Sequence, residues 1–395
     1  MLSMPGLDAG SRTASEPLIQ PILQFGTSRF LQAHVDLFVS QALESGDALG
    51  GIAVVQTTDS ADSAARTAAF ASGNAYPVQI RGLLRGTVLD QTLSCRAIRQ
   101  SAHARTDWTR IREAVSGPVQ VIVSNTADSG YQLDERDDAG AATAQARAPY
   151  SFPAKLLVLL YGRWQSQPNA PLSLFPCELV ERNGDALRAI IVRLASQWRL
   201  PGDFIHYLAE HCVWANSLVD RIVSESIKPV GAVAEPYALW AIERQPRLQL
   251  PCVHASIALT DDLRHFEQLK LFFLNLGHTF LAERWLRDGR PPDETVYHAM
   301  NDPVLRAALE AVWMDEVLPV FQALGKRNDA LAYLDEVRER FLNPFLHHRI
   351  ADIAQNHPQK KQRRIVPLLE LAASLAKGTG AGIEQPRLRE AATSP

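Results

Sequence analysis

The first half of the chain alternates short apolar runs with segments of helical periodicity. The run PILQF ends at Gly26, and the following FLQAHVDLFVSQALES carries apolar residues at the spacing of an amphipathic helix. Three apolar runs have the length and composition of buried parallel strands: residues 21–25, 51–58 and 119–126. The less regular segment 76–98 predicts extra strands before a helix near 107–115. This order of elements predicts an α/β fold for the N-terminal half.

Long helical patterns dominate the chain from about residue 204 onward. The strongest segment, LRHFEQLKLFFLNLGHTFLAERWLRDG, spans 263–289, and Gly289 marks its expected end. Both ends of the chain lack such periodicity. Residues 1–20 therefore predict a flexible tail, and residues 376–395 predict a disordered one.

Composition narrows the class of protein. The 395 residues include 40 Lys plus Arg and 43 Asp plus Glu, a net charge of −3 that argues against a general nucleic-acid binder. The four cysteines are scattered without a C-x-x-C pair, so neither a disulfide framework nor a zinc knuckle is expected. The N-terminal stretch does not have the pattern of a signal peptide, and no apolar run is long enough to span a membrane. A cytoplasmic protein without a membrane partner is expected.

The turn after the first predicted strand is the first candidate binding site. Gly26, Thr27, Ser28, Arg29 and Phe30 stand where a dinucleotide-binding fold places its glycine-rich turn, at a helix N-terminus that can hold a pyrophosphate. Of the three glycines of the G-x-G-x-x-G fingerprint only the first is present. The same glycine could simply turn a strand into a helix, and this alternative stays open.

Asp59 follows the second predicted strand, 33 residues beyond Gly26. An acidic side chain in this region receives the adenosine ribose hydroxyls in NAD-binding folds, whereas an arginine accommodates the 2′-phosphate of NADP. No arginine follows Asp59 directly. The sequence therefore favours NAD over NADP, with a solvated loop aspartate as the alternative.

Three polar residues interrupt the apolar helix of 263–289. Lys270, Asn275 and His278 have the spacing K-x4-N-x2-H, which on a regular α-helix places Asn275 about 140° and His278 about 80° round from Lys270. A lysine in apolar surroundings loses its proton more readily and can act as a general base. The alternative is structural: the lysine reaches solvent, the asparagine bonds a backbone group and the histidine is a satisfied core residue.

Several segments in order resemble the polyol-specific long-chain dehydrogenases, a family that includes mannitol 2-dehydrogenase, fructuronate reductase and tagaturonate reductase. The resemblance runs from about residue 21 to 370 and rests on these segments: ILQFGTSRFLQAH, VSNTADSGY, FPAKLLVLLYGRW, PCELVERNGDAL, SLVDRIVSE, EPYALWAIE, the lysine helix and FLNPFLHHRIADIAQ. ILQFG, SNT, PCELVERNG and LVDRIV are most similar to the tagaturonate reductase branch.

The resemblance implies a fold and a division of the chain. It implies a Rossmann-type NAD-binding domain over residues 21–225 and a mostly α-helical substrate and catalytic domain over 226–375. Hydride transfer at a secondary alcohol, without a metal, is the activity that it implies. Asn125 of the SNT segment joins the expected cofactor-binding residues.

Individual roles also follow from the resemblance. Lys270 matches the catalytic base, Asn275 and Asn183 match the asparagines that polarise the carbonyl, and His278 matches a histidine that orients a substrate hydroxyl. Asp220 matches an aspartate near the substrate.

Departures from the family pattern lie at the turn and beyond it. Ser28 replaces a glycine, Gln32 stands where an arginine is usual, and Asp128 stands where glutamate is usual.

The basic stretch KKQRR consists of Lys360, Lys361, Gln362, Arg363 and Arg364. A nucleic-acid patch and a solvated helix end are two interpretations of it. The third is that one or two cations reach a substrate carboxylate, since a fixed positive group selects a sugar acid over a neutral polyol.

Two cations are the candidates for this contact: Lys360, which matches a basic residue of the family, and Arg349. The adjacent His347 and His348 are poorly placed for joint metal ligation, and no metal is expected.

Together these features predict an NAD(H)-dependent oxidoreductase that interconverts a keto sugar acid and its hydroxy acid, of the tagaturonate and altronate type. A neutral-polyol dehydrogenase and a non-catalytic dinucleotide-binding protein are the rival hypotheses. A small sugar acid or polyol is the expected partner, with no nucleic acid, and the sequence leaves the oligomeric state open, a monomer included.

Overall fold

A computed structural model describes residues 16–58, 61–126, 128–142, 147–379 and 382–394. The chain forms two compact units. The first comprises residues 1–79, 92–233 and 238–261, and the second comprises residues 80–91, 234–237 and 262–395. Among the described residues no helix is both long and apolar enough to cross a bilayer.

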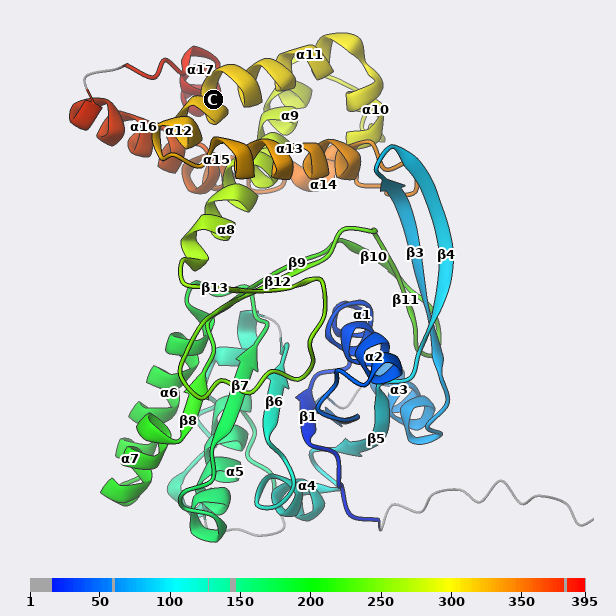
Figure 1. The fold of residues 1–395 in the computed structure, drawn as a ribbon, viewed down its shortest axis with the longest axis vertical. Helices are drawn as coiled ribbons and strands as arrows, with labels where there is room; N and C mark the ends of the chain where they lie inside the picture. Colours follow the sequence, from blue (N-terminus) through cyan, green and yellow to red (C-terminus); the bar gives the residue numbers. More distant parts are fainter. Residues whose placement is uncertain (1–15, 59–60, 127, 143–146, 380–381, 395) are drawn as a thin grey trace, which may run out of the picture. The chain divides into compact units, whose positions relative to one another are not determined.

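A six-stranded parallel sheet forms the centre of the first unit (Figure 1). Its strands lie in the order β5–β2–β1–β6–β7–β8, which is the 3-2-1-4-5-6 order of a dinucleotide-binding fold. Their bounds are β1 Ile22–Phe25, β2 Ile52–Gln56, β5 Ile98–His103, β6 Val121–Ser124, β7 Leu172–Pro176 and β8 Cys212–Trp214. Every residue of β1, β2, β6 and β7 is buried, as expected for a sheet covered on both faces. The predicted Rossmann-type fold is confirmed.

Helices connect these strands and complete the core of the first unit. Their bounds are α1 Arg29–Ala33, α2 Val35–Ser45, α3 Ala61–Ala71, α4 Trp108–Val115, α5 Phe152–Ser166, α6 Asn183–Gln197 and α7 Gly202–Glu210, with 3₁₀ turns at Asp128–Tyr131 and Ala139–Ala142. Apolar side chains of α4, α5, α6 and α7 pack together with those of the sheet in one cluster. The strands and helices expected in residues 21–126 are present, including the helix near 107–115.

Two smaller sheets complete the strand inventory. One has the order β13–β12–β9, with β9 Ser217–Asp220, β12 Leu239–Glu243 and β13 Ile257–Thr260. The other has the order β10–β11–β3–β4, with β3 Tyr76–Leu84, β4 Thr87–Cys95, β10 Val223–Ser226 and β11 Ala232–Ala234. The strands β3 and β4 are the extra strands expected from the irregular segment 76–98.

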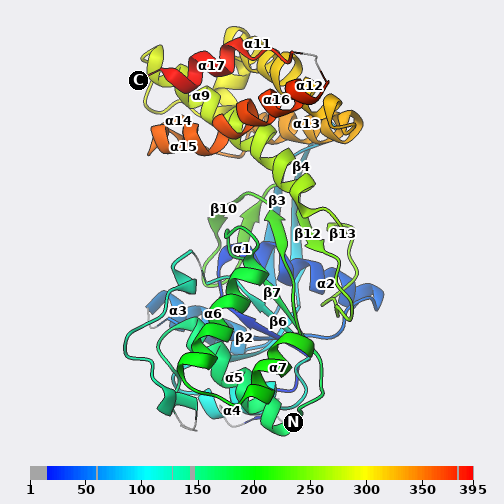
Figure 2. The same cartoon turned by 90° about the vertical axis from the view of Figure 1, so that its left-hand side faces the viewer.

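The second unit is mostly helical, as predicted, and its helices gather around a separate apolar core (Figure 2). The helices are α8 Leu263–Leu269, α9 Leu276–Arg287, α10 Val296–Asn301, α11 Pro303–Ala311, α12 Leu318–Ala323, α13 Arg327–Phe341, α14 Ile350–Ile353, α15 His357–Arg364, α16 Val366–Thr379 and α17 Pro386–Thr393. Two π-helical segments interrupt them, η3 Lys270–Asn275 and η4 Val312–Val317.

The prediction of a disordered C-terminal tail is wrong for α17. Leu388 is fully buried in the core of the second unit, and Glu316 accepts the backbone N–H groups of Arg387 (3.0 Å) and Leu388 (2.9 Å). The carboxylate thereby satisfies two free donors at the N-terminus of this helix. Of the flexible tail expected over 1–20, residues 1–15 lie outside the described part, whereas Leu18 is 3% exposed and belongs to the core of the first unit.

Candidate functional site

The turn between β1 and α1 requires a glycine. Gly26 has φ +112°, and a Cβ atom there would lie 2.6 Å from the carbonyl oxygen of Asn125. Asn125 follows β6, so the turns after the first and fourth strands of the parallel sheet are in contact. Open α/β sheets bind ligands at this point, where the strand order reverses.

The side chains of the turn are held by nearby partners. Thr27 is buried and its Oγ1 donates to Oε1 of Gln56 at the end of β2 (2.6 Å). Ser28 is the N-cap of α1 and accepts a hydrogen bond from the backbone N–H of Leu31 (3.3 Å). Arg29 is exposed, and the ring of Phe30 stacks on that of His34 at 4.8 Å.

Two amide side chains fix the turn to its surroundings. Nε2 of Gln32 donates to the carbonyl oxygen of Thr27 (3.0 Å), and its Oε1 accepts the N–H of Gly231 (2.7 Å). Nδ2 of Asn125 donates to the carbonyl oxygen of Cys177 (2.8 Å). Gln32, which replaces the usual arginine, is therefore a buried structural residue and provides no positive charge at the turn.

A different arginine reaches this turn. Arg66 on α3 donates from Nε to Oγ1 of Thr27 (3.1 Å) and from Nη2 to Oγ of Ser63 (3.1 Å). Both partners are neutral hydroxyls, and the other guanidinium donors have no partner among the described residues. Such a donor set fits a phosphate group. Asp59, the predicted ribose-binding residue, lies outside the described residues.

The sequence did not single out Arg66, because it lies seven residues beyond Asp59. Its side chain reaches the Gly26 turn because Arg66 lies on helix α3, and the sequence alone does not reveal this contact.

Asn183 is held by hydrogen bonds to several backbone groups. Its Nδ2 donates to the carbonyl oxygens of Pro176 (2.9 Å), Ser217 (3.0 Å) and Glu178 (3.2 Å). Its Oδ1 accepts the N–H groups of Ser217 (2.9 Å) and Gly184 (3.0 Å). With 1% exposure and every polar atom engaged, this amide fastens the start of α6 to β9. Its polarisation of a substrate carbonyl stays a prediction.

A buried carboxylate beside Asn183 was not predicted. Glu178 follows β7 and accepts hydrogen bonds from Oγ of Ser124 (3.0 Å) and from N and Oγ1 of Thr126 (both 2.9 Å). Burial raises its pKa, against the lowering effect of these hydrogen bonds. Burial and the nearby Glu178 raise the pKa of Tyr131, whose hydroxyl donates to the carbonyl oxygen of Asn183 (3.0 Å). The signal available in the sequence was the position of Glu178 in the segment PCELVERNG.

Asp220 is the last residue of β9 and is 3% exposed. It lies opposite Leu239 in the antiparallel pairing of β9 with β12. The structure thus places it in the first unit, at the end of a buried strand.

Lys270 and Asn275 bound a π-helical turn in the second unit. Within this turn the N–H of Leu276 donates to the carbonyl oxygen of Leu271, five residues earlier. In such a turn residues five apart lie one above the other, so the expected 140° between Lys270 and Asn275 is wrong here. Both side chains are half-buried while Phe272, Phe273 and Leu274 between them are buried in the core. Single π-turns inside α-helices occur frequently at functional sites.

His278 lies on α9, beyond the π-turn. It is 6% exposed, its ring stacks on Phe341 at 4.3 Å, and it meets the edge of His348 at 4.9 Å. Burial lowers the pKa of His348, and the charges of Lys360 and Arg364 lower it further against the opposing carboxylate of Asp352. Nδ1 of His348 is buried and has no hydrogen-bond partner among the described residues.

The two cations predicted to bind a substrate carboxylate already have partners. Arg349 is exposed and donates from Nε and Nη2 to the two carboxylate oxygens of Asp352, each at 3.0 Å. Nζ of Lys360 donates to the carbonyl oxygen of Ile353 (2.6 Å), and burial together with the charge of Arg364 lowers its pKa.

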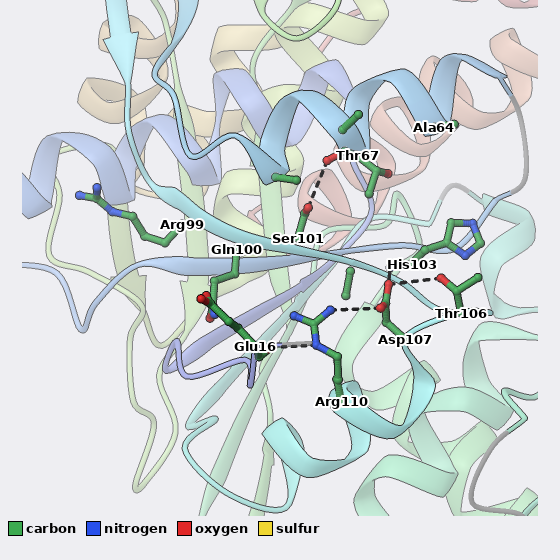
Figure 3. Close-up of a pocket in the computed structure, with 13 residues that line it drawn as sticks. Glu16, Ala64, Thr67, Arg99, Gln100, Ser101, His103, Thr106, Asp107 and Arg110 are labelled. Carbon is green, nitrogen blue, oxygen red and sulfur yellow. Dashed lines mark hydrogen bonds and ion pairs between the residues drawn. The ribbon is translucent and has the colours of Figure 1, made fainter. Parts of the chain in front are cut away.

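A separate pocket of about 410 Å³ lies against the edge strand β5 in the first unit (Figure 3). It is lined by α3, β5 and the start of α4, and none of the predicted site residues lines it. Its polar groups bond one another: Arg110 donates to Asp107 (3.1 Å), and Oγ of Ser101 donates to the carbonyl oxygen of Thr67 (3.1 Å).

Comparison with known proteins covers nearly the whole chain. Residues 20–251 match the model of the mannitol dehydrogenase Rossmann domain, and residues 262–380 match that of the mannitol dehydrogenase C-terminal domain. The altronate oxidoreductase of Halalkalibacterium halodurans is 30% identical over 378 residues, covering 90% of this chain and 71% of the relative. That of Klebsiella pneumoniae is 31% identical over 385 residues, covering 90% and 76%.

Solved structures share the fold at lower identity. A substrate-free D-sorbitol dehydrogenase superposes with a TM-score of 0.76 at 20% identity, covering 95% of this chain and 86% of that one. The mannitol 2-dehydrogenase of Pseudomonas fluorescens, solved as a ternary complex with NAD and D-mannitol, superposes with a TM-score of 0.69 at 17% identity, covering 96% and 79%.

Proposed function

Because the chain belongs to the mannitol dehydrogenase family, we propose that it is an NAD(H)-dependent oxidoreductase that interconverts a keto sugar acid and its hydroxy acid, of the tagaturonate and altronate type. The relatives at 30–31% identity are named altronate oxidoreductases, which supports this substrate class. The observation that carries the chemistry is the π-turn that places Lys270 and Asn275 on one side of the helix.

The second unit provides the groups for proton transfer. In the oxidative direction the neutral amine of Lys270 accepts the proton of the substrate hydroxyl, and in reduction the ammonium returns it to the forming alkoxide. The side-chain amide of Asn275 donates a hydrogen bond to the same oxygen, which stabilises the negative charge that develops there. His278, held between Phe341 and His348, orients a neighbouring hydroxyl.

The first unit provides the cofactor site. A bound nicotinamide cofactor supplies the acceptor or donor of the hydride. We assign its pyrophosphate to the Gly26 turn, where the φ of +112° favours glycine, whose missing Cβ leaves the backbone open to a close approach. Thr27, Ser28, Arg29 and Phe30 complete that turn, and Asn125 and Arg66 border it. The unused donors of Arg66 support a phosphate ligand.

The test is NADH oxidation by the purified protein, followed by absorbance, with tagaturonate, fructuronate and fructose as substrates. We expect rapid turnover with a keto acid, and a loss of at least about 100-fold in kcat in Lys270→Met, since general acid–base catalysis contributes roughly 10²–10⁴-fold. Lys377→Met, at an exposed position of α16, removes the same charge and serves as the control.

Three results would contradict parts of this proposal. Undiminished turnover in Lys270→Met would remove the lysine from the mechanism. Preference for fructose over both keto acids would favour a neutral-polyol dehydrogenase. Nucleotide binding without turnover on any of the three substrates would favour a non-catalytic binding protein.

A further inference from the structure

Arg364, the last residue of α15, is a partly buried cation with a neutral partner. Its Nη1 donates to Oγ1 of Thr279 at 3.3 Å, and burial lowers the pKa of the guanidinium. No carboxylate of a described residue forms an ion pair with it. A charge that is withdrawn from water without an opposite charge destabilises the fold, so its retention calls for a function.

The other buried cations of the second unit show the contrast. Arg340, with 2% side-chain exposure, pairs with Glu235 at 2.8 Å, and Lys361, with 4%, pairs with Glu283 at 3.3 Å. Arg364 lacks such a carboxylate partner among the described residues, and so does its neighbour Lys360, whose Nζ donates to the carbonyl oxygen of Ile353. Of the two, Arg364 has the planar guanidinium that can bind a carboxylate through two hydrogen bonds.

The position of Arg364 relates it to the proposed reaction. Helix α15 packs against α9 (Figure 2), and Thr279, the partner of Arg364, directly follows His278. Oγ1 of Thr279 also donates to the carbonyl oxygen of Asn275 (3.0 Å). The guanidinium therefore lies beside the helix turn that carries Asn275 and His278.

The electrostatic neighbourhood of Arg364 favours an anion. Lys360 lies one turn earlier on α15, and the two like charges lower the pKa of His348. The buried Nδ1 of His348 has no partner among the described residues, which adds an unused polar atom next to the cations. Arg349, the candidate from sequence, faces Asp352 instead and is neutralised there.

We propose that Arg364 binds the carboxylate of the substrate and thereby makes the enzyme select a sugar acid over the corresponding neutral sugar. The proposal rests on the proposed function and extends it to the residue that determines substrate class. A planar guanidinium can donate two parallel hydrogen bonds to a carboxylate, whereas a hydroxymethyl group in the same place offers no charge.

The experiment compares Arg364→Met and Arg364→Lys with the wild type on two substrates, tagaturonate and tagatose, which differ by a carboxylate in place of a hydroxymethyl group. In Arg364→Met we expect KM for tagaturonate to rise at least tenfold, with KM for tagatose and the dissociation constant of NADH unchanged. Arg364→Lys, which keeps the charge, should recover part of the loss. Arg363→Met, at the exposed neighbouring position, is the matched control and should behave as the wild type.

Altronate binding to the NADH-free proteins, measured by calorimetry, separates this proposal from the proposed function. If the wild type turns over tagaturonate and both Arg364 variants keep its KM and its altronate affinity, the reaction stands and the role of Arg364 is refuted. If the wild type catalyses no reaction but binds altronate at least tenfold more tightly than Arg364→Met does, the carboxylate site stands and the proposed reaction is refuted. If KM rises equally for tagaturonate and tagatose in Arg364→Met, Arg364 is structural and the proposal fails.

Discussion

Replacement of Gly26 by alanine tests whether the turn after β1 holds the cofactor. Gly26 has φ +112°, in a region that residues with a Cβ adopt at a cost of about 1–3 kcal/mol. Gly46, which ends α2 with φ +82°, is the matched control, because a Cβ there meets nothing within 4 Å. Gly46→Ala therefore introduces backbone strain without a collision.

The collision at Gly26 sets the size of the expected effect. The new Cβ would lie 2.6 Å from the carbonyl oxygen of Asn125, whereas ordinary contact begins at 3.4 Å, so the two turns must separate by 3.4 − 2.6 = 0.8 Å. The displaced atoms are backbone atoms, which cannot rotate away as a side chain can. If the same backbone contacts the pyrophosphate, we expect NADH affinity to fall by at least about tenfold, equivalent to ~1.4 kcal/mol.

NADH fluorescence titration and denaturant unfolding of both variants provide the measurement. Gly26→Ala should lose NADH affinity and more unfolding free energy than Gly46→Ala, which should bind NADH like the wild type. Wild-type NADH affinity in Gly26→Ala would refute the assignment of the pyrophosphate to this turn. Equal loss of affinity in both variants would show that the effect reflects general destabilisation.

Two further predictions concern charged groups of the first unit. Arg66→Ala should weaken nucleotide binding by about tenfold or more, because charge-assisted hydrogen bonds contribute ~1.5–3 kcal/mol. Equal losses of NADH and NADPH affinity would indicate that Arg66 binds the pyrophosphate, whereas a loss of NADPH affinity alone would indicate that it binds the 2′-phosphate. Unchanged affinity for both nucleotides would exclude Arg66 from the site. Burial raises the pKa of Asp36 from 3.8 to about 6, so the folded state holds its proton more tightly than the unfolded state does. The stabilisation that results from this tighter proton binding is complete below pH 3.8 and is lost as the pH rises through about 6. The difference of 2.2 pKa units corresponds to about 3 kcal/mol of unfolding free energy. In urea titrations, the unfolding free energy of Asp36→Asn relative to that of the wild type should therefore increase by about that amount between pH 4 and pH 7. A difference between the two proteins that does not change with pH would contradict the raised pKa of Asp36.

The fold was largely predictable because its sheet is parallel. Strands buried on both faces are mostly apolar without alternation, and residues 21–25, 51–58 and 119–126 show such runs, with a few polar residues such as Gln24 among them. The C-terminal tail was not predictable in the same way. Helix α17 carries few apolar residues, and it is positioned by Leu388 and by the distant carboxylate of Glu316, neither of which produces a local periodic signal.

The candidate site was predictable only where the sequence spacing fixes the geometry. Lys270 and Asn275 were found as polar interruptions of an apolar helix, but their angular relation depends on a π-turn that a uniform helical period cannot reveal. Asn183 shows a second limit, since its hydrogen bonds join segments up to 34 residues apart, and no local pattern in the sequence reveals such contacts.

The two arginines that the structure adds share one physical property. Arg66 and Arg364 each have neutral hydroxyl partners, whereas Arg349 is paired with a carboxylate. In the sequence these residues are equivalent cations, because charge and helical position do not reveal which carboxylates fold against them. The difference between a cation that stabilises the fold and one that awaits a ligand is therefore a property of tertiary contacts. A sequence pattern such as KKQRR can indicate that a carboxylate-binding cation is present. Only the positions of Thr279 beside Arg364 and of Asp352 beside Arg349 show which of the two arginines is the candidate.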